Sequence, residues 1–544
     1  MPADAHGTLA RVAVSTTKAR LALAPPSATL GVVAVFVIAL AGAAALHHEA
    51  SLPAHVSRGQ AVRAALGDSS VRKYLAAHPF TRERVTPVDN KLARVSFFDG
   101  PRIVLEAAVA GDGRVVSQIV HKPGDVRVGG EIAQRPAVLA LLLAAFALAA
   151  ASVPFRRMRN LDVLALAAFA VPVVLMNARL LEASVYTSYP LLAYLCIRCG
   201  LVALRPQAAE ARAQPLIERI VRPRLIAVGA AAAAAALVLL AIPGGLVGDV
   251  AFASMAGATK LTHGTLPYGH LPANELVHGD TYPLLAYAAY VPAALITPVK
   301  TGFDQLDGAL WVAAGFALAA AFALYRVGGR RLAIAWLTFP PVVIAASAGA
   351  NDLVAAACIA WAAALFLHSG RSAAALSAAA LVKLAPFAAL PLWVLRARGN
   401  GLARAVAGVG AVAGAVALWI VLLDGAGGLR DMADAVSFQA ERGSLQSLWA
   451  LTGAGAAQVA VQAAVATLAV AGAAQVWRDP LLARDRRRVC ALAAAVLLGA
   501  QMAANYWSYT YLCWAFPVIA AALLAESGAK PAPSRAPAFP APRP

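Results

Sequence analysis

The sequence predicts an all-α polytopic membrane protein with about 14 transmembrane helices and one small α+β domain outside the membrane. Its 544 residues are 60% hydrophobic and only 13% charged, and the mean hydropathy is +0.69. A soluble domain usually carries about 25% charged residues. This apolar excess cannot be hidden in a soluble core, because the surface would then be apolar as well. The composition therefore excludes a soluble enzyme, a disordered chain and a fibrous protein.

The net charge of +19 comes largely from short basic clusters between the apolar runs. This pattern follows the positive-inside rule, which places arginine and lysine in cytoplasmic loops. No basic folded domain remains to bind nucleic acid, so no nucleic-acid partner is expected. The five cysteines lie in apolar segments without the spacing of a zinc site, and we interpret them as small buried residues.

The first predicted transmembrane helix covers residues 27–46 and follows a short N-terminal segment, residues 1–26. Arg11, Lys18 and Arg20 precede this helix, which predicts a cytoplasmic N-terminus. A cleaved signal peptide is the alternative interpretation. The apolar run is long for a signal sequence, so we expect an uncleaved helix.

Residues 47–135 mix polar and apolar residues and predict a small extracytoplasmic α+β domain. One or two amphipathic helices come first, and short strands separated by turn residues follow. The helix-then-meander order and the Asp-Gly turns resemble a PepSY-type module. We expect this domain to have a structural role or to dock a partner in envelope assembly.

Residues 136–223 are expected to hold accessory transmembrane helices and a cytoplasmic linker, and residues 224–525 a larger transmembrane module. The predicted spans are 136–154, 161–177, 187–204, 224–243, 283–299, 306–325, 332–348, 351–368, 372–395, 403–423, 452–475, 489–505 and 508–525. Residues 526–544 contain six prolines and no periodicity, which predicts a disordered tail. These spans place both termini in the cytoplasm and the chain in the cytoplasmic membrane.

Most arginine clusters fall on the cytoplasmic side of these spans, as the positive-inside rule requires. The exceptions are Arg326, Arg330 and Arg331, which the predicted spans place outside. Either one span boundary is wrong, or these arginines have a function such as binding a phosphate.

Two polar segments, residues 244–282 and 424–450, are predicted as long outer loops. Asp249 lies at the membrane boundary, where an acid is tolerated if it faces a cavity. The first segment also carries many titratable and aromatic side chains: Lys260, His263, Tyr268, His270, Glu275, His278, Asp280 and Tyr282. This concentration indicates a functional site, with a solvated loop as the alternative.

Several short motifs lie in this module. Asp249 follows an apolar run, and residues 264–268 read Gly-Thr-Leu-Pro-Tyr. Residues 282–284 read Tyr-Pro-Leu, and an aromatic segment covers residues 505–518. A Gly-x-Asn step and a Lys-x-x-Pro step lie between them, and their residues are Gly349, Asn351, Lys383 and Pro386.

These motifs together resemble the GT-C glycosyltransferases, membrane enzymes that use polyprenyl-phosphate sugars. They are most similar to the mannosyltransferases of glycosyltransferase family 87. The similarity covers residues 224–525, with Ala350 where relatives often have glutamine. It implies a GT-C-like fold, a polyprenyl-phosphate donor with mannose as the expected sugar, and an envelope glycan or glycolipid acceptor. Transfer would occur on the outer face of the membrane with inversion of configuration.

An inverting transfer requires one base to take the proton from the acceptor hydroxyl, and no covalent sugar intermediate. We predict Asp249 as this general base, with Asp280 as the alternative. The leaving lipid phosphate needs a cation to neutralise it, and Lys383 and Arg442 are the candidates. His278 and Asp280 are further candidates for contacts with the donor. A Lys383 side chain that merely extends to the membrane interface is the alternative reading.

The remaining candidates are expected to contact sugar or acceptor hydroxyls: His263, Tyr268, His270, Tyr282, Asn351 and Gln446. The histidines at positions 263, 270 and 278 with Asp280 also suggest a divalent-metal site. Their spacings of seven and eight residues fit no standard ligand pattern, so no metal and no cofactor are expected.

Two hypotheses from other classes stay open. A transporter or lipid flippase also has many spans with few charges, and Pro340-Pro341 provides the kind of helix break that transporters use. A scaffold protein, whose outer domain recruits partners, is the other.

Overall fold

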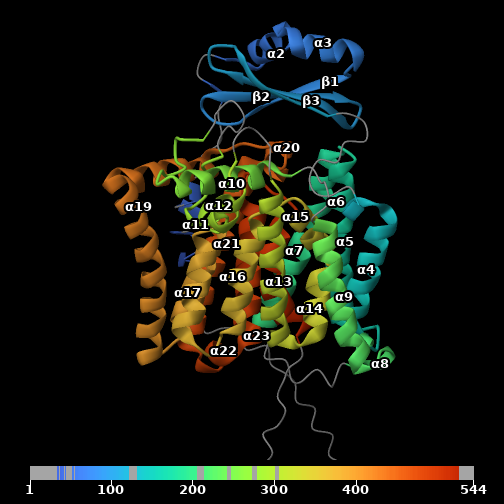
Figure 1. The fold of residues 1–544 in the computed structure, drawn as a ribbon, viewed down its shortest axis with the longest axis vertical. Helices are drawn as coiled ribbons and strands as arrows, with labels where there is room; N and C mark the ends of the chain where they lie inside the picture. Colours follow the sequence, from blue (N-terminus) through green and yellow to red (C-terminus); the bar gives the residue numbers. More distant parts are fainter. Residues whose placement is uncertain are drawn as a thin grey trace, which may run out of the picture.

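The computed structural model shows a bundle of helices with a small α+β domain seated on one end (Figure 1). It describes the chain except residues 1–33, 36, 39, 42, 45–51, 54–55, 122–131, 205–213, 242–246, 272–278, 300–305 and 526–544. The predicted first span at 27–46 and both termini therefore lie wholly or mostly outside the described residues. We call the end of the bundle under the α+β domain the domain end, and the opposite end the basic end.

The bundle helices are named here with their bounds. They are α4 (Pro136–Ala150), α5 (Met158–Ala168), α6 (Ala170–Asn177), α7 (Leu181–Leu204), α8 (Leu216–Ile220), α9 (Pro223–Ala241), α10 (Asp249–Thr262), α11 (Leu285–Ala288), α12 (Val291–Ile296), α13 (Asp307–Gly328), α14 (Arg330–Thr338), α15 (Pro340–Ser347), α16 (Asp352–Ala364), α17 (Ser369–Ala380), α18 (Leu390–Leu395), α19 (Asn400–Glu441), α20 (Leu448–Thr452), α21 (Gly455–Arg478), α22 (Pro480–Arg484), α23 (Arg486–Ala503) and α24 (Tyr511–Ile519). Short 3-10 or π turns add η1 (Ile132–Gln134), η2 (Ala385–Ala389) and η3 (Ala520–Leu524), and β5 (Ser152–Val153) pairs with β6 (Gln214–Pro215).

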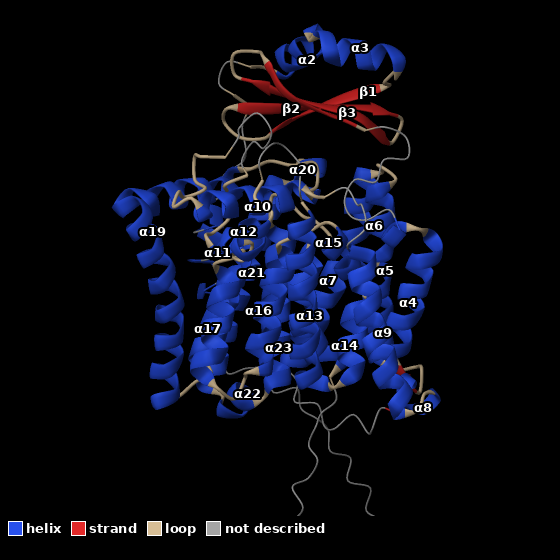
Figure 2. Cartoon of the chain, in the orientation of Figure 1, coloured by secondary structure: helices blue, strands red, loops and turns tan. Residues whose placement is uncertain are grey.

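The α+β domain has the helix-then-strand order that the sequence predicts. Its helices are α2 (Arg58–Gly67) and α3 (Ser69–Ala77), and its strands are β1 (Arg82–Pro87), β2 (Leu92–Asp99), β3 (Arg102–Ala110) and β4 (Val115–Val120). The strands pair antiparallel in sequence order. Ser57 and Gln60 form a capping box that starts α2, and Asp68 accepts the first amides of α3. Both helices lie on the sheet face away from the bundle (Figure 2).

Alternation along β2 divides its side chains between the two faces of the sheet. Ala93, Val95 and Phe97 pack in the small core under α2 and α3. Phe98, together with Ile103 of β3, belongs instead to the large core of the bundle. The α+β domain is therefore packed onto the bundle rather than tethered to it.

Polar contacts reinforce this docking. Arg82 and Arg84 of β1 form ion pairs with Glu182 of α7, at 3.1 and 3.4 Å. Arg84 also donates to the carbonyl oxygens of Ala450 and Leu451 in α20. These contacts hold one edge of the sheet at a constant place above the bundle.

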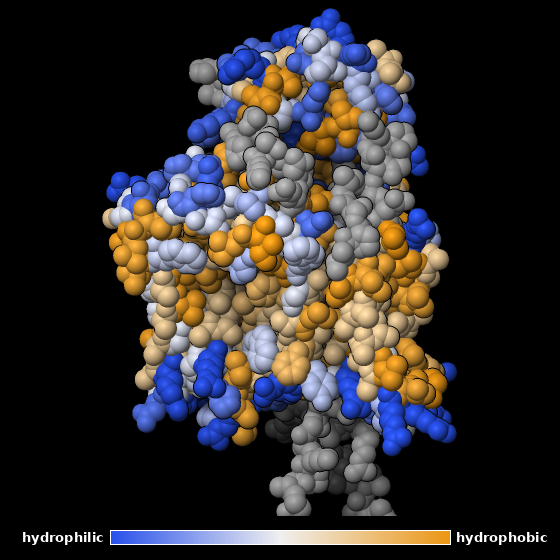
Figure 3. Space-filling model, in the orientation of Figure 1, coloured by the Kyte–Doolittle hydropathy of each residue, from blue (hydrophilic) through white to orange (hydrophobic). Residues whose placement is uncertain are grey.

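The bundle has the surface of a membrane-embedded protein. An apolar belt separates two hydrophilic ends (Figure 3). Six described helices are long and apolar enough to cross a membrane, and they are Met158–Asn177, Leu181–Leu204, Pro223–Ala241, Asp307–Gly328, Asn400–Gln439 and Gly455–Arg478. Four shorter apolar helices accompany them, so the full count of fourteen spans stays a prediction.

The predicted span 283–299 is wrong. It consists of the two short helices α11 and α12, which stay at the domain end. Leu285 donates its amide to the carbonyl of Leu381, and the Tyr290 hydroxyl donates to the carbonyl of Gly349. The first half of the segment is buried in protein, with Tyr287 and Tyr290 fully inaccessible, whereas Leu295 and Ile296 of α12 are exposed. Hydropathy alone does not separate such a buried segment from one that faces lipid.

The predicted span 372–395 is also wrong, because it is a hairpin of two helices rather than one helix. α17 ends at Ala380, the chain turns, and η2 and α18 return beside it. The indole of Trp393 donates to the hydroxyl of Ser372 at 2.7 Å, which places the two outer arms side by side. Lys383 therefore lies at the turn and not at the middle of a span.

The two predicted outer loops contain helices. α10 occupies much of the first half of the 244–282 segment, and nine of its 14 residues are buried. In the 424–450 segment, α19 continues to Glu441 after a kink at Asp424 and Gly425. Gly425 has φ +60°, a conformation that glycine adopts without strain. The first part of α19 runs along the bundle to the domain end, and after the kink the helix runs across that end (Figure 1).

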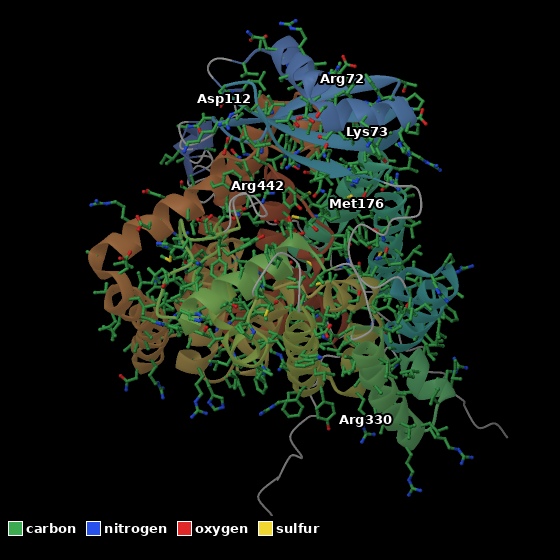
Figure 4. All side chains as sticks on the ribbon, turned by 45° about the horizontal axis from the view of Figure 1, so that its top comes forward. Arg72, Lys73, Asp112, Met176, Arg330 and Arg442 are labelled. Atoms are coloured by element: carbon green, nitrogen blue, oxygen red, sulfur yellow. The ribbon has the colours of Figure 1, made fainter. Side chains whose placement is uncertain are left out.

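These boundary changes remove the conflict over Arg326, Arg330 and Arg331. α13 carries the chain to the basic end, where Arg331 donates to the carbonyl of Leu524 and Arg330 to that of Pro223. Figure 4 shows Arg330 far from the α+β domain. The arginines that appeared exceptional thus lie at the end that also holds the other basic clusters.

Candidate functional site

A cavity of about 190 Å³ lies between the sheet and the domain end of the bundle. Its roof comes from β2, β3 and β4, and its floor from the starts of α10 and α16, the turn after α17 and the end of α19. Among the described residues, five charged side chains line it, and they are Arg94, Asp249, Asp352, Lys383 and Arg442. Three cations thus face two carboxylates, which leaves one positive charge in excess. We call this space the charged cavity.

Asp249 is the first residue of α10 and its side chain is exposed. Gly248 before it donates its amide to the carbonyl of Ala348, which ties the start of α10 to the loop before α16. Within the described chain, the Asp249 carboxylate accepts one hydrogen bond, from the amide of Val250 at 2.8 Å. A carboxylate oxygen therefore stays free to accept a proton.

Gly349 makes this arrangement possible. Its φ is +69°, and a Cβ there would lie 2.9 Å from the Cβ of Ala251 in α10. A side chain at this position would push α10 away from the loop that Gly248 contacts. Asn351 strengthens the same junction by donating from Nδ2 to the Ser254 hydroxyl at 3.2 Å.

Asp352 and Lys383 form a buried ion pair on the cavity floor. The Lys383 ammonium lies 3.6 Å from the Asp352 carboxylate, and Trp514 donates its indole N–H to the same oxygen at 3.1 Å. The ammonium also lies 4.3 Å from the centre of the Tyr282 ring. Opposite charges and an aromatic face compensate the loss of water around this lysine.

Arg442 lies at the end of α19, under the α+β domain (Figure 4). Its guanidinium stacks on the Tyr506 ring at 3.9 Å and donates to Oε1 of Gln439 at 3.4 Å. The Nε–H is buried and has no hydrogen-bond partner within the described chain. A buried guanidinium with a free donor is suited to an anionic group of a ligand.

Tyrosines surround the charged groups but none is available as a base. Burial raises the pKa of Tyr506 to about 12, although the Arg442 guanidinium acts to lower it. Burial likewise raises the pKa of Tyr282, to which Asp249 adds by repulsion. Both hydroxyls therefore stay protonated near neutral pH.

The outer-loop candidates lie apart from Asp249. Asp280 accepts the amide of Gly269 at 2.8 Å, and Tyr268 donates its hydroxyl to the carbonyl of Tyr282 at 3.2 Å. His263 bonds back to the carbonyl of Thr259. These contacts shape the loop, and none of these residues lines the charged cavity, nor does His270.

Three other predicted site residues differ in their placement. Tyr282 lines the charged cavity, whereas Asn351 lies beneath it as a link between helices. Gln446 accepts the amide of Trp507 on its backbone carbonyl and lines no cavity described here. His278 lies outside the described residues.

Sequence reasoning missed Asp352, Arg94, Tyr506 and Tyr511 as cavity residues. The sequence does indicate Asp352, because it is an acid at the boundary of an apolar run, as Asp249 is. Arg94 carried none, because alternation shows that it faces away from Val95 but not which sheet face meets the bundle.

In the part of the chain that the structure describes, no group of three or more His, Cys, Asp and Glu could hold a metal ion. Fold and site together define a helical membrane-embedded protein with a charged cavity under an α+β domain. No family model, no curated protein and no solved structure matches the chain.

Proposed function

We propose that the chain is a membrane glycosyltransferase that moves a sugar, with mannose as the expected one, from a polyprenyl phosphate to an envelope glycan or glycolipid. One observation carries this proposal: an unneutralised carboxylate, Asp249, shares a cavity with the cations Lys383 and Arg442 at the edge of a membrane bundle. The resemblance of residues 224–525 to the GT-C glycosyltransferases agrees with it.

In the proposed reaction the acceptor oxygen attacks the anomeric carbon of the donor sugar. The bond from that carbon to the phosphate oxygen breaks, and the lipid phosphate leaves with the electron pair. The acceptor proton passes to the Asp249 carboxylate. No covalent intermediate forms on the protein, so the configuration at the anomeric carbon inverts.

The cations act on the leaving group. A sugar phosphodiester carries one negative charge, and the released monoester gains a second. The one excess positive charge of the charged cavity matches the single negative charge of the bound phosphodiester. The free Nε–H of Arg442 can donate a hydrogen bond to the second negative charge, which develops as the phosphate leaves. Arg442 and Lys383 are therefore the proposed phosphate ligands, and Asp352 positions Lys383.

The orientation of the bundle is part of the proposal. The arginine clusters lie at the basic end, which the positive-inside rule assigns to the cytoplasm. The charged cavity and the α+β domain then face the outside of the cytoplasmic membrane. A lipid-linked donor would enter from the outer leaflet, with no cofactor and no resident metal.

The feature that favoured a transporter has a structural explanation. The break between α14 and α15 lies at Phe339 and Pro340, both of which are fully packed. Phe339 stacks against Phe516 at 4.7 Å, and neither residue lines the charged cavity. The break is filled by side chains instead of opening toward a substrate, which supports the enzyme over the transporter.

The experiment that tests the proposal is label transfer by the purified protein. Polyprenyl phosphates carrying labelled mannose, glucose, galactose or arabinose would each be offered with envelope lipids and glycans as acceptors. Transfer from at least one donor by the wild type, but not by Asp249→Asn, is expected. A folded wild-type protein that transfers none of these sugars would sink the proposal.

A further inference from the structure

A second and larger cavity, of about 710 Å³, adjoins the charged cavity. Its walls come from α2 and β1 of the α+β domain on one side, and from α20 and the start of α21 on the other. Arg442, Gly443 and Ser444 line both cavities and form the border between them. We call this space the domain cavity. Its volume lies within the range of about 300–1,000 Å³ that ligand pockets occupy.

Arginine dominates the ionisable groups of the domain cavity. In the part of the chain that the structure describes, its cationic side chains are Arg58, Arg63, Arg84 and Arg442, against one carboxylate, Glu83. Arg84 is already engaged by Glu182 and by two carbonyls of α20. Arg58 and Arg63 form neither an ion pair nor a hydrogen bond through their guanidinium groups within the described chain. The wall from α2 thus offers two guanidinium groups that no protein group neutralises.

The opposite wall offers groups suited to a saccharide. Trp449 is half-buried, and its indole N–H donates to the carbonyl of Met502. The residue can therefore contact a ligand through its ring rather than through the N–H. Gln458 donates its amide to the carbonyl of Ala503 and to Oδ1 of Asn505, which leaves Oε1 of Gln458 as the acceptor that this pair offers at the wall. An aromatic ring beside amides and guanidinium groups is a combination that binds sugar rings bearing anionic substituents.

We propose that the domain cavity binds the acceptor, and that this acceptor is a saccharide carrying carboxylate or phosphate groups. The role of the saccharide as acceptor rests on the proposed function, whereas the binding of an anionic saccharide does not. The anionic groups lie against Arg58 and Arg63, and the saccharide extends across the Arg442–Ser444 border toward Asp249. The α+β domain is then one wall of the acceptor site, which gives a reason for its tight docking onto the bundle.

The test is equilibrium binding to the purified full-length protein, without any donor. The probes are fluorescent hexagalacturonate, a phosphorylated hexamannoside and neutral maltohexaose. The variant is Arg58→Gln with Arg63→Gln, and the control is Lys73→Gln, an exposed cation on α3 outside the cavity. At least one anionic probe should bind, and the double variant should weaken it by about tenfold or more. Size-exclusion profiles verify that each variant is folded.

Three results would overturn the inference. Neither anionic saccharide binds, or maltohexaose binds equally well, or the double variant binds like Lys73→Gln. Binding of phosphatidylglycerol vesicles, lost in the double variant and without saccharide binding, would overturn the inference and reassign the cavity to lipid headgroups. If binding is confirmed but no sugar is transferred, the proposed function fails while the binding site stands.

Discussion

The ammonium of Lys383 and the carboxylate of Asp352 lie 3.6 Å apart, and both side chains are almost fully buried. The pair links the start of α16 to the turn after α17, so two separate helices meet at one point under the charged cavity. Breaking a buried ion pair leaves an uncompensated charge, whereas removing both partners does not. This asymmetry makes the pair testable.

Lys383→Met should destabilise the protein by about 3–5 kcal/mol, because Asp352 keeps its charge without a cation. Thermal unfolding in detergent measures the loss, with Lys73→Met as the exposed control. The double variant Asp352→Leu/Lys383→Met should recover most of the stability but no sugar transfer. A Lys383→Met variant with the melting temperature of the wild type would show that the ion pair contributes little to stability.

Substitutions at Tyr506 separate its ring from its hydroxyl. Because the pKa of this hydroxyl is raised to about 12, it stays protonated below that pH and does not titrate near neutrality. Tyr506→Phe should therefore leave the pH–rate profile unchanged up to about pH 10. Tyr506→Ala removes the ring under Arg442 and should raise the donor KM about fivefold. Loss of an alkaline limb in Tyr506→Phe would instead make the hydroxyl a participant.

Gly349→Ala should lower the free energy of unfolding by about 1–3 kcal/mol, because the φ of +69° and the 2.9 Å approach to Ala251 both oppose a side chain. The displaced α10 should also lower transfer, because Asp249 begins that helix. Gly315→Ala is the matched control: it is helical, and its added Cβ would meet nothing within 4 Å. Equal melting temperatures for the two variants would contradict this account of Gly349.

The orientation of the bundle is testable with single cysteines in a background where the native cysteines are replaced. Asp112→Cys lies in the α+β domain and Arg330→Cys at the basic end (Figure 4). A membrane-impermeant maleimide should label position 112 in intact cells, and position 330 only after lysis. The opposite pattern would place the α+β domain in the cytoplasm and move the proposed chemistry to the wrong side.

Composition and hydropathy predict the helical membrane class and the α+β segment, because both depend on local pattern. They do not predict which apolar runs cross. Tyr287 and Tyr290 lie in a run whose first half is buried in protein at the domain end. The 372–395 run contains a chain reversal whose only polar residue is Lys383. In both segments the deciding interactions come from residues distant in the chain.

Four predicted site residues lie in the charged cavity, and they are Asp249, Tyr282, Lys383 and Arg442. The histidines and Asp280 are predicted as site residues because they lie close together in the sequence. In the structure, His263 and Asp280 form hydrogen bonds within their own loop. Arg94 enters from a strand that precedes Asp249 by more than a hundred residues. Only the docking of the sheet brings it there.

The most direct test of the central claim is the transfer rate of Asp249→Asn relative to Asp280→Asn, with the same donor and matched expression. Asp249 lines the charged cavity, whereas Asp280 is tied to Gly269 outside it. We expect a rate at least about 100-fold below wild type for Asp249→Asn, and near wild type for Asp280→Asn. Full activity in Asp249→Asn, or loss only in Asp280→Asn, would contradict this expectation.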